Sequence, residues 1–173
     1  MKETFNKPRP NEINRFVYDA EFGETIAVAK FLHKFGNSTV NAVDVAGCSA
    51  LLMAASRGYK KTVEFLLEKG AEVDQKTPEG ITALMLAAKN GHGEVVGVLL
   101  SAGASLEEAD NLGQTAINYA EKGEHDGLVS FMNAYHKLQK EERAALWLEE
   151  TDCGKGLKTA MPVPRRLVPR GGM

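Results

Sequence analysis

Apolar side chains recur along the chain in short groups with helical spacing, and polar segments that contain glycine separate these groups. In one group, Val63, Leu66 and Leu67 stand at positions i, i+3 and i+4, which places them on one face of a helix. Gly70 follows this group, where helices commonly end in the left-handed conformation. Paired small residues such as Ala54-Ala55 allow neighbouring helices to pack closely. The pattern predicts an all-α chain of short helices joined by turns.

The same pattern repeats along the chain with a constant period. Residues of one chemical type recur at this period in several columns: Gly47, Gly80 and Gly113; Ser49, Thr82 and Thr115; Leu51, Leu84 and Ile117; Val63, Val96 and Val129. The glycines suit turns whose backbone angles other residues avoid, and the hydroxyl residues suit the capping position before a helix. Each unit is therefore predicted to be a turn, a helix, a second turn and a second helix. One such unit cannot bury its apolar face alone, so the units are expected to stack.

Two segments carry the signature of a known family. Residues 44–58 read DVAGCSALLMAASRG, and residues 91–104 read GHGEVVGVLLSAGA. The first resembles the turn and first helix of the ankyrin repeat, and the second resembles its second helix and closing glycine. The resemblance covers about residues 11–134 and implies an all-α ankyrin-repeat solenoid of about four helix-turn-helix units with projecting turns. We place the units at residues 11–43, 44–76, 77–109 and 110–135.

Some positions depart from the family pattern. The first unit has two extra residues, which we place around residues 35–39. In the fourth unit, the glycine after the first helix, Gly123, stands one position early. The family's Thr-Pro-Leu-His signature lacks its histidine in this chain, and we expect apolar contacts from Leu52 and Met85 to replace the lost hydrogen bond.

The segments that flank the repeats have their own predicted character. Residues 1–10 are expected to form a flexible arm, and residues 136–150, which include Trp147, are expected to form a C-terminal helix. This helix has two open interpretations, a cap over the end of the stack or an amphipathic recognition element for another chain. Residues 151–173 contain three prolines and five basic residues, which predicts a basic, disordered tail.

Composition and charge narrow the classes of function. Hydrophobic residues make up 43% of the chain, and no run approaches the ~20 apolar residues that cross a bilayer. The N-terminus does not resemble a secretory signal, and Cys48 and Cys153 are far apart in the chain, so a reducing, cytoplasmic location is predicted. Residues 151–173 carry a formal charge of +4, which leaves −6 on residues 1–150 of a chain whose total is −2. An acidic body argues against nucleic-acid binding by the repeats.

The residues that could carry chemistry do not form a pattern typical of a catalytic or metal site. The histidines, His33, His92, His125 and His136, have no cysteine or acidic neighbour at metal-ligand spacing. His92 and His125 occupy the same position in successive units and are predicted to be structural. Cys48 lies in a turn without a histidine beside it that could act as a base. We therefore expect no catalytic activity, no cofactor and no metal.

The resemblance implies that a partner binds a concave wall made of the turn tips and the exposed faces of the first helices. Carried over by position, the predicted partner-binding residues are Phe22, Val43, Val45, Cys48, Arg57, Lys76, Glu79, Ile81, Lys89, Asn90, Leu112 and Gln114. The same wall takes in Glu21, Ala46, Ser56, Pro78, Ala109, Asn111 and Lys122. Apolar members of the wall would form a strip of the kind that binds proteins, with Ile81 near its centre. The alternative is that the tips pack on one another within the stack.

These observations predict a non-catalytic protein–protein interaction module, either an adaptor or a regulator of its partner. The alternative is an accessory or sensor subunit that uses the basic C-terminal tail to contact lipid or nucleic acid. Partner binding by a chain that lacks residues 151–173 would separate the two hypotheses.

Overall fold

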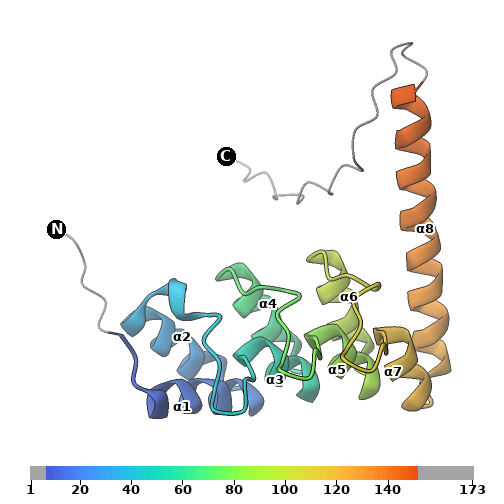
Figure 1. Ribbon diagram of the computed structural model, residues 1–173. Coiled ribbons are helices and arrows are strands. Elements are labelled where there is room, and N and C mark those ends of the chain that lie inside the picture. The colour runs from blue at the N-terminus through green and yellow to red at the C-terminus, as the bar shows by residue number, and fades with distance from the viewer. Residues whose placement is uncertain (1–6, 152–173) are drawn as a thin grey trace. The chain divides into compact units, whose positions relative to one another are not determined.

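The computed structural model describes the backbone of residues 7–151 and the side chains of residues 7–141. This part of the chain contains eight α-helices, one short 3-10 helix and no strand, so the predicted all-α class is confirmed (Figure 1). The elements are α1 (Pro10–Glu21), α2 (Thr25–Phe35), η1 (Asn37–Thr39), α3 (Ala50–Arg57), α4 (Lys60–Glu68), α5 (Ala83–Lys89), α6 (Gly93–Ser101), α7 (Ala116–Lys122) and α8 (Asp126–Thr151). The described residues divide into two compact units, the first ending at Asn133 and the second beginning at Ala134. The start of the predicted arm, the tail from residue 152 onward and the side chain of Trp147 lie outside the described residues.

The helices of the first compact unit form two layers (Figure 1). The helices α1, α3, α5 and α7, here called the inner helices, pack side by side in one layer. In the other layer, α2, α4 and α6 each pack against the inner helix that precedes them. Leu51 and Leu84 from the inner helices are buried, as are Leu66 and Leu99 from the second layer. Burial of one such side chain contributes roughly 1.5–3 kcal/mol, so this apolar interface is the main source of stability.

The turns before the inner helices have the predicted backbone. Their glycines have left-handed φ angles of 78°, 84° and 75° in Gly47, Gly80 and Gly113. Side-chain carboxylates close two of these turns. Asp110 Oδ1 accepts the amides of Leu112 and Gln114 at 2.9 and 2.8 Å, and Asp44 accepts two amides in the same way. The turns are therefore held by local hydrogen bonds and not only by packing.

Two of the three predicted hydroxyl caps form, at Ser49 and Thr82, whereas Thr115 makes no side-chain cap hydrogen bond. Thr82 Oγ1 accepts the amide of Met85 at 3.4 Å. Leu52 and Met85 replace the family's histidine, and both side chains are buried, as expected. In the fourth unit, Asn118 Oδ1 accepts the amide of Thr115 at 3.0 Å and its hydroxyl at 3.1 Å. Met85 Sδ accepts the equivalent amide of Thr82 at 3.5 Å, so this contact is not purely apolar in the third unit.

Each joint between successive units stacks a ring on a glycine of the preceding unit: Tyr59 on Gly23, His92 on Gly58 and His125 on Gly91. The two histidines also reach back to carbonyl oxygens of that unit. His92 Nε2 lies 3.0 Å from the carbonyl oxygen of Ser56, and His125 Nε2 lies 3.1 Å from that of Lys89. The predicted structural role of both histidines is confirmed.

The fourth unit differs from the prediction at the turn between its helices. Gly123 has a φ of −84°, and the left-handed residue is Glu124, with a φ of 59°. Glu124 stands one full period after Gly91, so the turn keeps the register of the repeat although the residue type is strained there. Gly123 has another role, because a Cβ at this position would collide with the carbonyl oxygen of Lys89.

Two helix boundaries also depart from a regular repeat. In the first unit, α2 has 11 residues where α4 has 9, and η1 follows it, within the segment where the insertion was placed. At the other end, α8 runs from Asp126 to Thr151 without interruption. The second helix of the fourth unit and the predicted C-terminal helix are therefore one element, and the predicted boundary at residues 135–136 is not a helix end.

Candidate functional site

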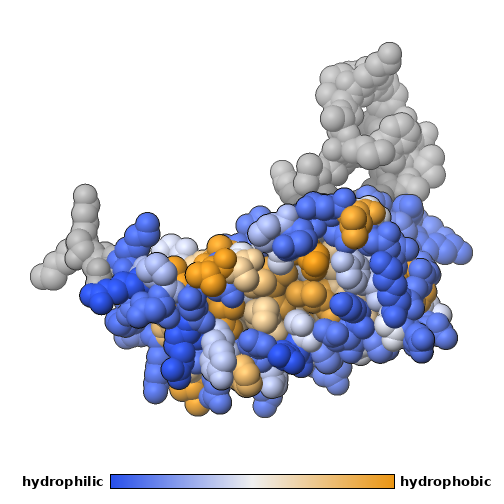
Figure 2. Space-filling model, turned by 60° about the horizontal axis from the view of Figure 1, so that its bottom comes forward, coloured by the Kyte–Doolittle hydropathy of each residue, from blue (hydrophilic) through white to orange (hydrophobic). Residues whose placement is uncertain are grey.

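The inner helices share one row of large side chains at the surface. Met53, Leu86 and Tyr119 are each the fourth residue of their helix, one period apart, and each is partly exposed. Tyr18 has the corresponding place in α1, since it precedes Gly23 by the same interval as Met53 precedes Gly58, and its side chain is 52% exposed. We call these four residues the inner row. Figure 2 shows hydrophobic residues gathered in the middle of the face that the inner helices present, with hydrophilic residues around them.

Four of the predicted apolar binding residues lie at the surface. The turn-tip residues Val45 and Leu112 are 86% and 82% exposed, and Val43 is 41% exposed. Phe22, at the end of α1, is 50% exposed, and its ring lies 4.4 Å from that of Tyr18, centroid to centroid. Solvent-exposed apolar side chains therefore occur both at the turn tips and along the inner row.

Ile81 differs from this group, although its position in the sequence predicted an exposed tip residue. It follows Gly80, and its carbonyl oxygen accepts the amide of Thr77 at 3.0 Å, which closes the turn. Cys48 and Gln114 occupy the same position in the neighbouring units, and all three side chains are partly buried. In sequence, these residues stand between the turn tips and the inner helices.

A polar edge borders the inner row at the C-terminal ends of the inner helices. Arg57 forms an ion pair with Glu21 at 2.5 Å, and Asn90 Nδ2 donates to the carbonyl oxygen of Ser56 at 2.8 Å. These groups surround a hollow of about 540 Å³, lined by Glu21, Met53, Ser56, Arg57, Asn90 and His92. Two of the predicted binding residues, Arg57 and Asn90, therefore meet in one depression. Lys89 and Lys122 stand exposed on the same edge in the third and fourth units.

The turn side of the face is also polar. Lys76 forms an ion pair with Glu108 at 2.7 Å. The side chain of Glu79 lies exposed at the third tip, and hydrogen bonds from the Thr77 hydroxyl and its own amide hold the pKa of its carboxyl below the usual range. Asn111 Nδ2 donates to the carbonyl oxygen of Pro78 at 3.0 Å, so adjacent tips are tied together.

One inner-row side chain is anchored to a turn. The Tyr119 hydroxyl donates to Asp110 Oδ2 at 2.7 Å, while the other oxygen of that carboxylate holds the turn amides. Burial and this hydrogen bond raise the pKa of Tyr119 to about 12. The amide of Gln114 and the Tyr119 hydroxyl lower the pKa of Asp110. This contact fixes the ring of the row to the tip that carries Leu112.

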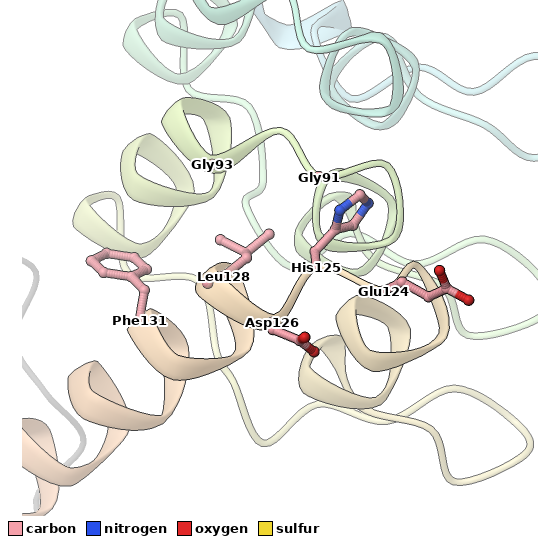
Figure 3. Close-up of a pocket in the computed structure, with 8 residues that line it drawn as sticks. Gly91, Gly93, Glu124, His125, Asp126, Leu128 and Phe131 are labelled. Carbon is pink, nitrogen blue, oxygen red and sulfur yellow. The ribbon is translucent and has the colours of Figure 1, made fainter.

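A second hollow, of about 680 Å³, lies where the turn before α8 meets α6, lined by Gly91, Gly93, Glu124, His125, Asp126, Gly127, Leu128 and Phe131 (Figure 3). His125 Nε2 is engaged by the carbonyl oxygen of Lys89. The carboxylates of Glu124 and Asp126 point away from the imidazole, whereas a general base would need an orienting acid within hydrogen-bond reach (Figure 3). The geometry of this hollow is that of a joint between units.

Other chemical features can be stated for the described residues only. Within that part of the chain, no group of three or more His, Cys, Asp and Glu side chains could hold a metal ion. None of its helices has the length and apolar character needed to cross a membrane. Cys48 is a free thiol, and burial raises its pKa, which reduces the thiolate fraction that a nucleophile requires.

The inner row was not predicted from the sequence, although a signal was present. Met53, Leu86 and Tyr119 keep the period of the repeat, but they differ in type and each lies among buried residues of a short helix. Helical periodicity within one unit assigns such a residue to the core. Comparison of the equivalent position in all four units would have shown a large side chain in each unit.

Comparison with known families supports the repeat assignment. Residues 72–142 match the family model described as ankyrin repeats in three copies, and residues 46–78 match the model of a single ankyrin repeat. Together the matches span residues 46–142, which is more than half of the chain. No curated protein matches the sequence.

Proposed function

The chain belongs to the ankyrin repeat family, and on that basis we propose that it is a non-catalytic adaptor or regulator that binds a partner protein through its inner face. Ankyrin repeats are generally protein–protein interaction modules and are typically non-catalytic. The inner face comprises the inner row, the turn tips and the polar edge at the ends of the inner helices. The observation that carries the proposal is the row of large side chains, one in each unit.

The chemistry of the face supports this proposal. Protein-binding surfaces combine an apolar centre with a polar rim. Here Leu86 and Tyr119 supply apolar area in the centre, and the Arg57–Glu21 ion pair supplies part of the rim. Aromatic side chains such as Tyr18 and Phe22 give large contact area at low entropic cost, which suits a binding hot spot.

We also propose a cytoplasmic location. Cys48 is a free thiol within the repeats, and a reducing compartment keeps such a thiol free.

Affinity capture with matched variants tests the proposed function. The chain, the double variant Val45→Asp/Leu112→Asp and the control Ile26→Asp are each used to capture proteins from a cell lysate, which are quantified by mass spectrometry. All three positions are strongly exposed, with fractions of 86%, 82% and 73%, so none of the substitutions should impair folding. Ile26 lies on α2, outside the inner face, so its variant measures the effect of an added charge alone.

If the proposal is correct, some proteins from the lysate will bind the native chain and the Ile26→Asp control but not the double variant. Identical sets of proteins from all three baits would show that the inner face is not the binding surface.

A further inference from the structure

Two lysines on the inner face form no ion pair with any carboxylate of residues 7–141. Lys89 and Lys122 are the last residues of α5 and α7, hold equivalent positions in successive units and are exposed. Two other cations of this face are paired, Arg57 with Glu21 and Lys76 with Glu108. At the ends of the inner helices, an ion pair neutralises the cation of the second unit, whereas Lys89 and Lys122 form no ion pair, although Lys122 lies close enough to Asp110 to lower the pKa of that carboxyl.

Each of these ammonium groups borders the inner row. Lys89 follows Leu86 by three residues and Lys122 follows Tyr119 by three, so each pair lies on one side of its helix. The ammonium of Lys122 lies 5.6 Å from the centroid of the Tyr119 ring. The third and fourth units thus present the same arrangement twice: one large, partly exposed side chain with one cation beside it.

Favourable interaction with the helix dipole explains part of this pattern. A lysine in the last turn of a helix stabilises the helix by its attraction to the negative end of the dipole. That effect accounts for the position of a cation at each helix end. It does not account for a carboxylate partner at Arg57 and none at Lys89 and Lys122, since the dipole acts equally in all three helices.

The surrounding charge limits what can bind there. Residues 1–150 have a formal charge of −6, so a long polyanion such as a nucleic acid would be repelled by most of the repeat surface. A short segment carries fewer charges, so it would be repelled less while its carboxylates meet the two lysines. Apolar side chains beside those carboxylates would find Leu86 and Tyr119.

We propose that the inner face of the third and fourth units binds an acidic amphipathic helix of a partner protein; this inference rests on the proposed function. Its apolar side chains lie on Leu86 and Tyr119, and two of its carboxylates, one heptad apart, pair with Lys89 and Lys122. Packed helices such as α5 and α7 lie about 8–10 Å apart. Seven residues of a partner helix advance about 10.5 Å at about 1.5 Å per residue, which lies just above that interval. Same-face residues of an extended segment recur about every 6.6 Å, which lies further outside it.

Selection from a displayed peptide library tests the proposal. The library contains helix-forming peptides of three heptads with leucine at the a and d positions and a random choice of Glu, Lys, Gln or Ala elsewhere. The baits are the full chain, Lys89→Glu/Lys122→Glu, and the control Lys61→Glu, which reverses an exposed charge on α4 outside the inner face. We expect the chain and the control to select glutamates one heptad apart and the double variant to select lysines there. A selected acidic peptide should bind the double variant at least tenfold more weakly in dilute salt, and this difference should shrink in concentrated NaCl.

The outcomes separate this inference from the proposed function. Peptides that depend on Val45 and Leu112 but show no preference between Glu and Lys would overturn the acidic partner and leave the binding face intact. A library that yields no peptide dependent on the inner face would overturn the acidic helix, whereas the proposed function stands or falls with the affinity capture by Val45→Asp/Leu112→Asp. Tighter binding of a short single-stranded DNA than of any selected peptide, lost in Lys89→Glu/Lys122→Glu, would replace the acidic helix with a nucleic acid.

Discussion

The imidazole of His92 stacks on Gly58 of the preceding unit so closely that a Cβ at Gly58 would lie 2.6 Å from His92 Nδ1. Gly58 also has a left-handed φ of 78°. The packing of the His92 ring therefore requires glycine in the turn that the ring covers. A Gly58→Ala substitution, which adds one methyl group, tests this contact.

Gly58→Ala should destabilise the chain by about 2–4 kcal/mol, because it combines left-handed strain with a steric clash. The measurement is the free energy of unfolding from urea denaturation. Gly70→Ala is the matched control, since Gly70 has a φ of 90° but no neighbouring atom within 4 Å of the point where a Cβ would lie. The control should cost only about 1–2 kcal/mol. Equal losses for the two variants would show that the His92 contact has no energetic role.

Glu124→Gly should stabilise the fold by about 0.5–1 kcal/mol, because glycine adopts a φ of 59° without the strain of a side chain. Glu124→Ala keeps the Cβ and its strain, so it should change the stability by less than about 0.5 kcal/mol. Urea denaturation of both variants gives the comparison. A Glu124→Gly variant less stable than the native chain would mean that the Glu124 side chain makes a stabilising contact.

Acid should weaken the fold through Asp110. Its carboxyl has a lowered pKa in the folded state, so its contribution is fully present above the ordinary value of 3.8 and is lost as the pH falls through the folded value. Tyr119→Phe removes one hydrogen bond to this carboxylate and should bring that pKa back towards 3.8. The acid limb of the melting temperature should then begin at a higher pH in the variant. Coincident acid limbs for the two proteins would contradict this role of the hydroxyl.

Substitution of Ile81 should affect both partner binding and stability, although its sequence position predicts an effect on binding alone. Substitution of Leu84 should affect mainly stability. Leu84 is fully buried, and Leu84→Ala should cost about 2–5 kcal/mol of stability. Ile81 is partly buried, so Ile81→Asp should cost about 1–2 kcal/mol of stability as well as weakening partner binding. Urea denaturation and calorimetric titration of a captured partner measure the two effects. A loss for Ile81→Asp as large as that for Leu84→Ala would make Ile81 a core residue.

The sequence predicts the features that local chemistry decides and misses those that depend on neighbouring units. The turn glycines and the Thr82 cap follow from backbone preference and side-chain hydrogen bonding, so their positions were predicted. The left-handed residue of the fourth unit was not, because the nearby Gly123 fits the turn by residue type. In the structure, Gly123 is needed for its close approach to Lys89, and the register of the repeat leaves Glu124 in the turn.

The candidate binding face shows the same division. Val45 and Leu112 were identified as exposed because turn tips project in any repeat of this kind. The partial exposure of Leu86 and the partial burial of Ile81 depend on how successive units pack, which a single repeat does not encode. The continuity of α8 could have been predicted from the sequence, since no glycine or proline lies between Leu128 and Thr151. The boundary was instead placed at residue 135 because the repeat pattern ends there.

Glu124 has a consequence for how this protein could lengthen by duplication. A new copy of residues 77–109 could be inserted directly after residue 109, because both new joints would have a glycine under the histidine ring. The histidine of the new copy would pack on Gly91, and His125 would pack on the equivalent glycine of the new copy. A copy appended after the fourth unit would have to seat its ring on the Cβ of Glu124. Internal insertion therefore meets no such obstacle, whereas a unit added after the fourth would need both a glycine in place of Glu124 and an end to α8.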